Sequence, residues 1–232
     1  SCYTGGLDVH QARGWLVRRN TISGFWCDDG LSEHGIHFWK GCRDTVVEEN
    51  LILDCARGIG FGLGETGTAR VYPDDPYPGV PGLKGHIDGV IRNNFVAASA
   101  SGLFASPDGF DSGISLEQAY GAQVVHNSVA STQTPLSSSI EWRFANSVIG
   151  LHNNLGTSVM IPRDGGTATA SGNLASIATS FFAGIPSGDL HLTAAAGAAV
   201  DAGSPLPAGL ADTDFDGSPR DGPPDVGADE LT

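Results

Sequence analysis

Val17-Arg18-Arg19-Asn20-Thr21-Ile22 is the stretch that decides the fold, because its pattern returns along the chain. An apolar residue is followed three positions later by an Asn and, two positions after that, by another apolar residue. The aligned Asn residues are separated by 30, 44 and 33 residues. Self-similarity at such a period is typical of a solenoid. The further copies are Val47–Ile52, Ile91–Val96 and Val124–Val129, with weaker ones at His152–Leu155 and Ser171–Leu174.

A short alternating run precedes each copy. Gly6–His10 and Gly35–Trp39 are apolar at every second position, as β-strands are. Such a unit cannot bury its apolar face alone, so neighbouring units must stack on it. We expect one interior row made of Leu7, Ile36, Ile59, Ile114 and Ile140.

These patterns predict an all-β fold, a right-handed parallel β-helix solenoid with an irregular C-terminal capping tail. The recurring Asn suits a turn between strands, where its side chain can bond the adjacent coil and its backbone can be left-handed. A leucine-rich repeat would need shorter, Leu-dominated units, and a β-sandwich would not keep Asn in register. We expect coils over residues 1–185, interrupted by an insertion at about 64–85, and the tail over 186–232.

The C-terminal segment carries a family resemblance. Asp214–Arg220 (DFDGSPR) and Pro224–Glu230 (PDVGADE) resemble the closing segment of secreted bacterial β-helix proteins. Together with the Asn repeat, they make the chain similar to the right-handed parallel β-helix superfamily of pectate lyases. The resemblance implies a bacterial protein that is secreted or on the cell surface, and it implies a polysaccharide partner. Fold alone does not imply an activity.

Charge and hydropathy exclude two classes of partner. The chain has 26 Asp and Glu against 12 Lys and Arg, a net charge of −14, whereas a nucleic-acid partner would require a basic face. No apolar run is long enough for a transmembrane helix. The first coil begins by Gly6 without a capping helix, so we expect a missing segment or another chain to cover that end.

The four cysteines are Cys2, Cys27, Cys42 and Cys55. Cys27 follows Asn20 by seven residues and Cys55 follows Asn50 by five, so both fall in similar parts of successive coils. In an exported protein this spacing predicts a Cys27–Cys55 disulfide, with Cys2–Cys42 as a weaker possibility. A row of buried free thiols is the alternative.

Strand alternation also predicts which side chains leave the solenoid. Coils are about 4.8 Å apart, so outward side chains at equivalent positions form rows along one face. Lys40 and Arg43 lie just beyond the strands that carry these rows. The first row reads Asp8, His37, Gly60, Ser115 and Glu141, and the second reads His10, Trp39, Gly62, Glu117 and Arg143.

This face has the residue types of a site for acidic glycans. A histidine would act as the base, a Lys or Arg would neutralise a uronate, and a tryptophan would stack on a sugar ring. Gly60 and Gly62 would leave a dip for the ligand, and the aromatic, Pro-rich insertion would form a wall. The alternative is an ordinary solvated sheet surface. The assignment is catalytic for His10, His37, Lys40, Arg43 and Arg143, and substrate-binding for Trp39, Glu117, Glu141 and Tyr72.

The tail contains a possible calcium loop. Asp212, Asp214 and Asp216 have the D-x-D-x-D-G spacing of such loops, but Pro223 at the twelfth position excludes an EF-hand. The alternative is a structural Asp-Gly turn in which Arg220 pairs with Asp225 or Glu230. No other cofactor is indicated.

Two functions follow from these observations. The first is a carbohydrate-active protein, a polysaccharide lyase or hydrolase acting on acidic glycans. The second is a non-catalytic extracellular protein, such as an adhesin or a fibre subunit, which the acidic charge and the lack of a sharp catalytic motif favour. A base and a cation that converge on one groove would distinguish an enzyme from a structural protein.

Overall fold

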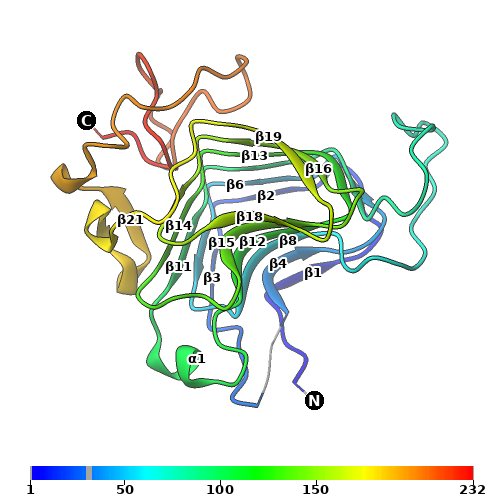
Figure 1. Cartoon of the computed structure of the whole chain (residues 1–232), viewed down its shortest axis with the longest axis horizontal. Helices are drawn as coiled ribbons and strands as arrows, with labels where there is room; N and C mark the ends of the chain where they lie inside the picture. Colours follow the sequence, from blue (N-terminus) through cyan, green and yellow to red (C-terminus); the bar gives the residue numbers. More distant parts are fainter. Residues whose placement is uncertain (1, 30–32, 232) are drawn as a thin grey trace.

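The computed structural model describes residues 2–29 and 33–231. Up to the tail, the strands lie in three parallel sheets, named A, B and C here (Figure 1). Along the chain a strand of sheet A is followed by strands of sheet B and sheet C, and the chain then returns to sheet A. We call one such round a coil. The predicted all-β architecture with stacked parallel strands is confirmed.

Each sheet is ordered by coil, so strands distant in sequence lie side by side. Sheet A contains β1 (Leu7–Val9), β4 (His34–Phe38), β8 (Arg57–Phe61), β12 (Ser112–Glu117), β15 (Ser138–Arg143) and β18 (Met160–Arg163). Sheet B contains β2 (Leu16–Arg18), β6 (Val46–Glu48), β10 (Val90–Arg92), β13 (Ala119–Val125), β16 (Val148–His152) and β19 (Thr167–Ser171), with β5 (Cys42–Arg43) and β9 (His86–Ile87) beside them. Sheet C contains β3 (Thr21–Ser23), β7 (Leu51–Leu53), β11 (Phe95–Ala98), β14 (Ser128–Ser131) and β17 (Leu155–Gly156).

The interior row of apolar side chains has the predicted register. Neighbouring strands of sheet A pair Leu7 with Ile36 and continue residue by residue to Ile140. The four isoleucines are completely buried, and each contributes roughly 1.5–3 kcal/mol of burial free energy. The members of the row, in order, are Leu7, Ile36, Ile59, Ile114 and Ile140.

A ladder of Asn side chains runs along the edge between sheets B and C. The Asn94 Oδ1 atom accepts hydrogen bonds from both the backbone N–H and the side-chain amide of Asn50, at 3.0 Å each. The Asn94 side chain in turn donates to the carbonyl of Val47, one coil earlier, at 2.9 Å. The ladder continues in the same way through Asn20, Asn50, Asn94, Asn127, Asn154 and Asn173.

The left-handed backbone at this edge belongs to the residue before each ladder Asn, which corrects the expectation that Asn itself adopts it. The φ angles of these preceding residues lie between 50° and 66°, and none of the residues is β-branched. The preceding residue therefore turns the chain, and the Asn side chain is left to bond the next coil. The turning residues are Arg19, Glu49, Asn93, His126, Asn153 and Gly172.

The C-terminal tail packs against the outer face of sheet C, a contact that the idea of an end cap did not anticipate (Figure 1). Phe95 and Leu155 of sheet C lie in one apolar cluster with residues of the tail. The predicted pairing of Arg220 with Glu230 is confirmed at 2.9 Å, and Arg220 also donates to Asn93. The tail elements are η1 (Thr179–Phe181), β20 (Phe182–Gly184), η2 (Ile185–Ser187), β21 (Asp189–Leu192) and η3 (Ala194–Ala196).

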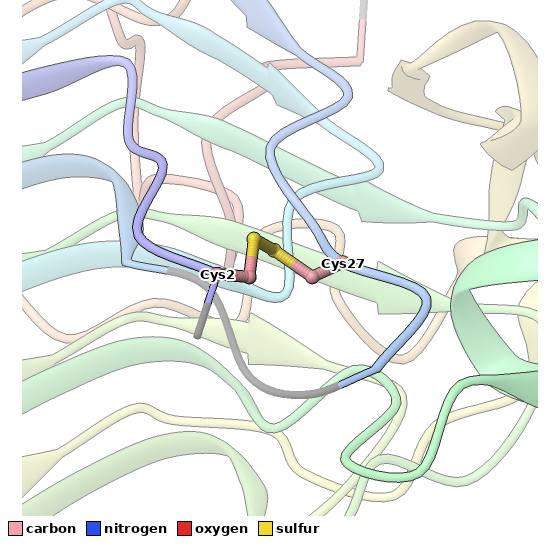
Figure 2. The surroundings of a disulfide bond; sticks show 2 residues. All are labelled: Cys2 and Cys27. Atoms are coloured by element: carbon pink, nitrogen blue, oxygen red, sulfur yellow. A yellow bond between two sulfur atoms is a disulfide. The ribbon is translucent and has the colours of Figure 1, made fainter.

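The disulfide joins Cys2 to Cys27, with their Cα atoms 6.2 Å apart, so the predicted Cys27–Cys55 bond is wrong (Figure 2). The weaker Cys2–Cys42 pairing is wrong as well, because Cys42 and Cys55 are buried free thiols. Equivalent positions in successive coils do not imply that two side chains face each other. Cys55 belongs to the interior cluster, and burial raises the pKa of its thiol to about 11.

Two excursions leave the coils. The short helix α1 (Ser101–Ala105) follows β11 and packs through Leu103 on a small cluster with Ala98 and Phe110. The insertion joins β8 to β9. Within residues 2–29 and 33–231, no helix has the length and apolar character needed to cross a membrane.

We expect Asn94→Ala to lower the free energy of unfolding by about 3 kcal/mol, because it leaves several buried backbone and side-chain groups of neighbouring coils without partners. Asn20→Ala, at the exposed end of the ladder, should cost about 1 kcal/mol. Urea unfolding of both variants measures the difference. Equal losses of unfolding free energy in the two variants would show that a buried Asn of the ladder stabilises the fold no more than the exposed one.

We expect acid to destabilise the fold through His86 and His126. Burial lowers the pKa of each ring from 6.5 to about 3, and each ring donates a proton from Nδ1 to a backbone carbonyl. Between these pH values the unfolded chain binds protons that the folded chain does not. Stability is therefore full above pH 6.5 and declines toward pH 3, by about 1.4 kcal/mol per pH unit for each ring.

Unfolding measured from about pH 4 to pH 7 checks this expectation. His126→Gln should show a shallower decline with acid than the wild type. A His126→Gln slope equal to the wild-type slope would contradict the assignment.

Candidate functional site

The outer face of sheet A carries the first predicted row in the predicted register. Asp8 pairs with His37, His37 with Gly60, Gly60 with Ser115, and Ser115 with Glu141. The residues that follow on the last two strands, Glu117 and Arg143, also pair, as the second row requires. Strand register alone therefore places the candidate residues of several coils on one surface.

Four aromatic rings form a column on this face. The rings of His10 and Trp39 stack with centroids 4.9 Å apart and an interplanar angle of 18°. Trp39 also contacts His37 at 4.7 Å, and His37 contacts His34 at 4.1 Å. His10 is exposed and Trp39 half-buried, whereas His34 and His37 are buried. The column thus leads from solvent into the protein.

The expected dip over the two glycines is filled. A Cβ atom at Gly60 would lie 2.5 Å from the Nε2 atom of His34, so the His34 ring occupies the space that the glycine leaves. A Cβ atom at Gly62 would collide with the carbonyl oxygen of Glu117. The glycines make room for neighbouring protein atoms and do not form a ligand cavity.

The charged groups at the ends of the strands are paired. Glu141 accepts a hydrogen bond from Arg163 at 2.8 Å, and burial raises the pKa of Glu141. Arg143 bonds Asp164 at 2.8 Å and lies 3.5 Å from Glu117. Arg143 and Arg163 remain partly exposed, at 25% and 37% of their side-chain surface, so an anion in solvent can reach them.

The first residues of the insertion contact one end of this face. Gly64 donates its backbone N–H to Glu117, and Lys40 donates to the carbonyl of Thr66. Gln118 bonds the carbonyl of Glu65 at 2.9 Å. These contacts hold the start of the insertion against the coils, and Lys40 is used to hold it. That the insertion forms the wall of a ligand site stays a prediction.

Arg43 and Tyr72 belong to a second cluster, at the base of the insertion. The Tyr72 hydroxyl donates to the carbonyl of Gly41 at 2.7 Å, and three guanidinium groups surround its ring at 4.8–5.8 Å. Asp74 accepts from Arg13 and Arg43, and this contact with Arg13 lowers the pKa of Asp74. The structure uses Arg43 and Tyr72 to hold the insertion on the coils. The guanidinium groups belong to Arg13, Arg43 and Arg70.

The three tail carboxylates proposed for calcium each serve separate hydrogen bonds. Asp212 accepts from the N–H of Gly209, Asp214 accepts from the N–H groups of Asp216 and Ser218, and Asp216 accepts from His191. This is the pattern of the structural Asp-Gly turn. Calcium binding by these groups stays a prediction.

Sequence reasoning missed Glu33 and His34. Glu33, His34 and His37 place one ligand atom each within 4.8 Å of one another. Strict alternation would put His34 and His37 on opposite faces, but a Cβ at Gly35 would point inward at Ile52, as the side chain of the next residue does. Two successive inward positions bring both histidines to the outer face. The spacing Glu-His-x-x-His was the available signal.

The buried setting of this trio disfavours a charged imidazole at His34. Burial lowers the pKa of His34 well below 6.5. The Nε2 atom of His34 lies 2.7 Å from the hydroxyl of Ser115, which spans the gap left by Gly60.

Comparison with protein families, curated proteins and solved structures finds no match for this chain.

We expect Gly60→Ala to destabilise the protein by about 1–3 kcal/mol, because the new methyl group would displace the buried His34 ring. Gly79→Ala is the matched control, since a Cβ there would meet no atom within 4 Å. Chemical unfolding of both variants tests this expectation. An unchanged stability in Gly60→Ala would mean that the His34 ring moves away without cost.

Proposed function

We propose that this chain is a secreted or cell-surface protein of the pectate-lyase-like, right-handed parallel β-helix type, and that it binds polysaccharide along the outer face of sheet A. The observation that carries the proposal is the stacked pair of His10 and Trp39 at the solvent end of the ring column. Aromatic rings held in a fixed orientation are suited to stacking on sugar rings. The proposed location agrees with the disulfide between Cys2 and Cys27.

The spacing of the coils supports a polymeric ligand. Equivalent positions recur about every 4.8 Å along the face, so an extended glycan can contact several coils at once. Arg143 and Arg163, on adjacent strands, are the cations that an acidic glycan would reach. Such a ligand would compete with Asp164 for Arg143, which favours weak, salt-sensitive binding.

Catalysis by a lyase or a hydrolase is the more demanding form of this proposal. A lyase needs a base and an unpaired cation at one groove. Arg43 and Arg143 already have carboxylate partners, Lys40 bonds a carbonyl, and His37 is buried. These contacts favour the second candidate, a non-catalytic extracellular protein that uses the same face for adhesion.

We expect Trp39→Ala to weaken glycan binding about tenfold, a loss of about 1.4 kcal/mol, because it removes the ring that holds the exposed His10 in a fixed orientation for stacking on a sugar. Trp15→Ala is the control, because Trp15 is an exposed tryptophan that precedes a strand of sheet B, away from this face. A glycan array identifies the ligand, and titration of the wild type and the two variants gives the affinities. Binding that is unchanged in Trp39→Ala removes this face from consideration.

The same glycans are incubated with the protein and assayed for new reducing ends and for the ultraviolet absorbance of unsaturated uronates. Either product would establish catalysis and identify its class. Binding without product supports the adhesive form, and an absence of binding to every glycan supports a purely structural role.

A further inference from the structure

The trio of Glu33, His34 and His37 contains two buried ring nitrogens that have no hydrogen-bond partner among residues 2–29 and 33–231. His34 and His37 are 2% and 0% exposed. These nitrogens are the Nδ1 atoms of the two rings. Both face the same carboxylate, since the Oε2 atom of Glu33 lies 3.4 Å from Nδ1 of His37 and 3.9 Å from Nδ1 of His34. Leaving such atoms unsatisfied costs about 1–3 kcal/mol each.

The Nε2 atoms of both rings already have hydrogen-bond partners. The Nε2 atom of His37 lies 2.9 Å from the carbonyl oxygen of Gly62. A carbonyl can only accept, so Nε2 carries the proton, and a neutral ring then presents its lone pair at Nδ1. The Nε2 atom of His34 has the hydroxyl of Ser115 as its partner, which can also accept. Two lone pairs can thus point at a carboxylate, an arrangement that a cation between them would stabilise.

We propose that Glu33, His34 and His37 bind one divalent transition-metal ion, with zinc as the best fit. Two imidazole nitrogens and a carboxylate are typical zinc ligands. In a tetrahedral site with bonds of about 2.1 Å, ligand atoms lie about 3.4 Å apart, and Glu33 and His37 are already at 3.4 Å. The Nδ1 atom of His34, at 3.9 Å from the same carboxylate oxygen, would have to move closer to complete the set.

The hydrogen bonds of the Nε2 atoms of His34 and His37 match those that metal-binding histidines make. A metal-bound histidine usually donates its other N–H to a carbonyl or another oxygen, which fixes the tautomer and the ring orientation. Gly62 and Ser115 supply these acceptors here. The competing occupant is a proton on one ring. A single proton satisfies one Nδ1 atom, whereas a metal ion satisfies both.

A second trio, His191, Asp216 and Asp229 in the tail, lacks these properties. His191 lies 2.6 Å from Asp189 through Nδ1 and 2.9 Å from Asp216 through Nε2, so both ring nitrogens have carboxylate partners. His191 is also partly exposed. His191→Ala is therefore the matched control for the variants of the proposed site.

The test uses the whole chain, freed of metal by chelation and then titrated with zinc chloride. We expect one zinc ion per chain by elemental analysis and an unfolding temperature that rises with zinc. Cobalt substituted for zinc should give the visible absorption of a four-coordinate site, without the intense near-ultraviolet band of a cobalt–thiolate bond. Such a band would assign the ion to Cys42 or Cys55 and overturn the proposal.

The variants separate a metal site from a merely structural cluster. Glu33→Gln keeps the shape of the side chain and should weaken zinc binding about a hundredfold, and Ser115→Ala should weaken it about tenfold. His37→Ala should abolish it, and His191→Ala should leave it unchanged. If His37→Ala does not fold, the first two variants decide the question. Wild-type protein that binds no stoichiometric zinc, or zinc binding that only His191→Ala removes, overturns the proposal.

Discussion

Hydrogen bonds between stacked Asn carboxamides set the register on which the other features depend. Asn50, Asn94 and Asn127 are completely buried, and a buried carboxamide must find its partners inside the protein. Each finds them in the adjacent coils, so slipping one coil by a residue would break bonds on both of its sides. The same register aligns His37, Gly60 and Ser115 on sheet A. The alignment of the polar residues on sheet A thus depends on hydrogen bonds at a different edge of the coil, the one between sheets B and C.

Glycine residues of sheet A also determine where the rings of His34 and His37 lie. Cβ atoms at Gly6, Gly35, Gly58 and Gly113 would all point at interior side chains of sheet C, so the chain can bend sharply toward the interior there only without a side chain. In the second coil this bend is followed by His37 and preceded by His34, which puts both rings on the outside. Gly60, one coil further, then leaves the space that the His34 ring fills.

The parts of this structure that repeat could be predicted from the sequence. Most contacts of the parts that do not repeat could not, with the pairing of Arg220 and Glu230 as the exception. The row from Leu7 to Ile140 and the pairing of His37 with Gly60 follow from a period and an alternation that any reader can align. The disulfide between Cys2 and Cys27 depends on how a segment outside the strands folds back, which no period encodes. The pairing of Arg43 with Asp74 depends in the same way on the path of the insertion.

The packing of the tail against the outer face of sheet C affects how the protein unfolds. In an array of coils that touch only their neighbours, stability is close to a sum of local terms, and the ends can fray independently. Here Arg220 of the tail bonds Asn93, and Gly188 lies against Leu51 of an earlier coil, so residues from the last fifth of the chain hold coils near its beginning. Early coils cannot separate without releasing the tail. A tail that links coils distant from it is therefore expected to make the stack unfold more cooperatively than coils that touch only their neighbours.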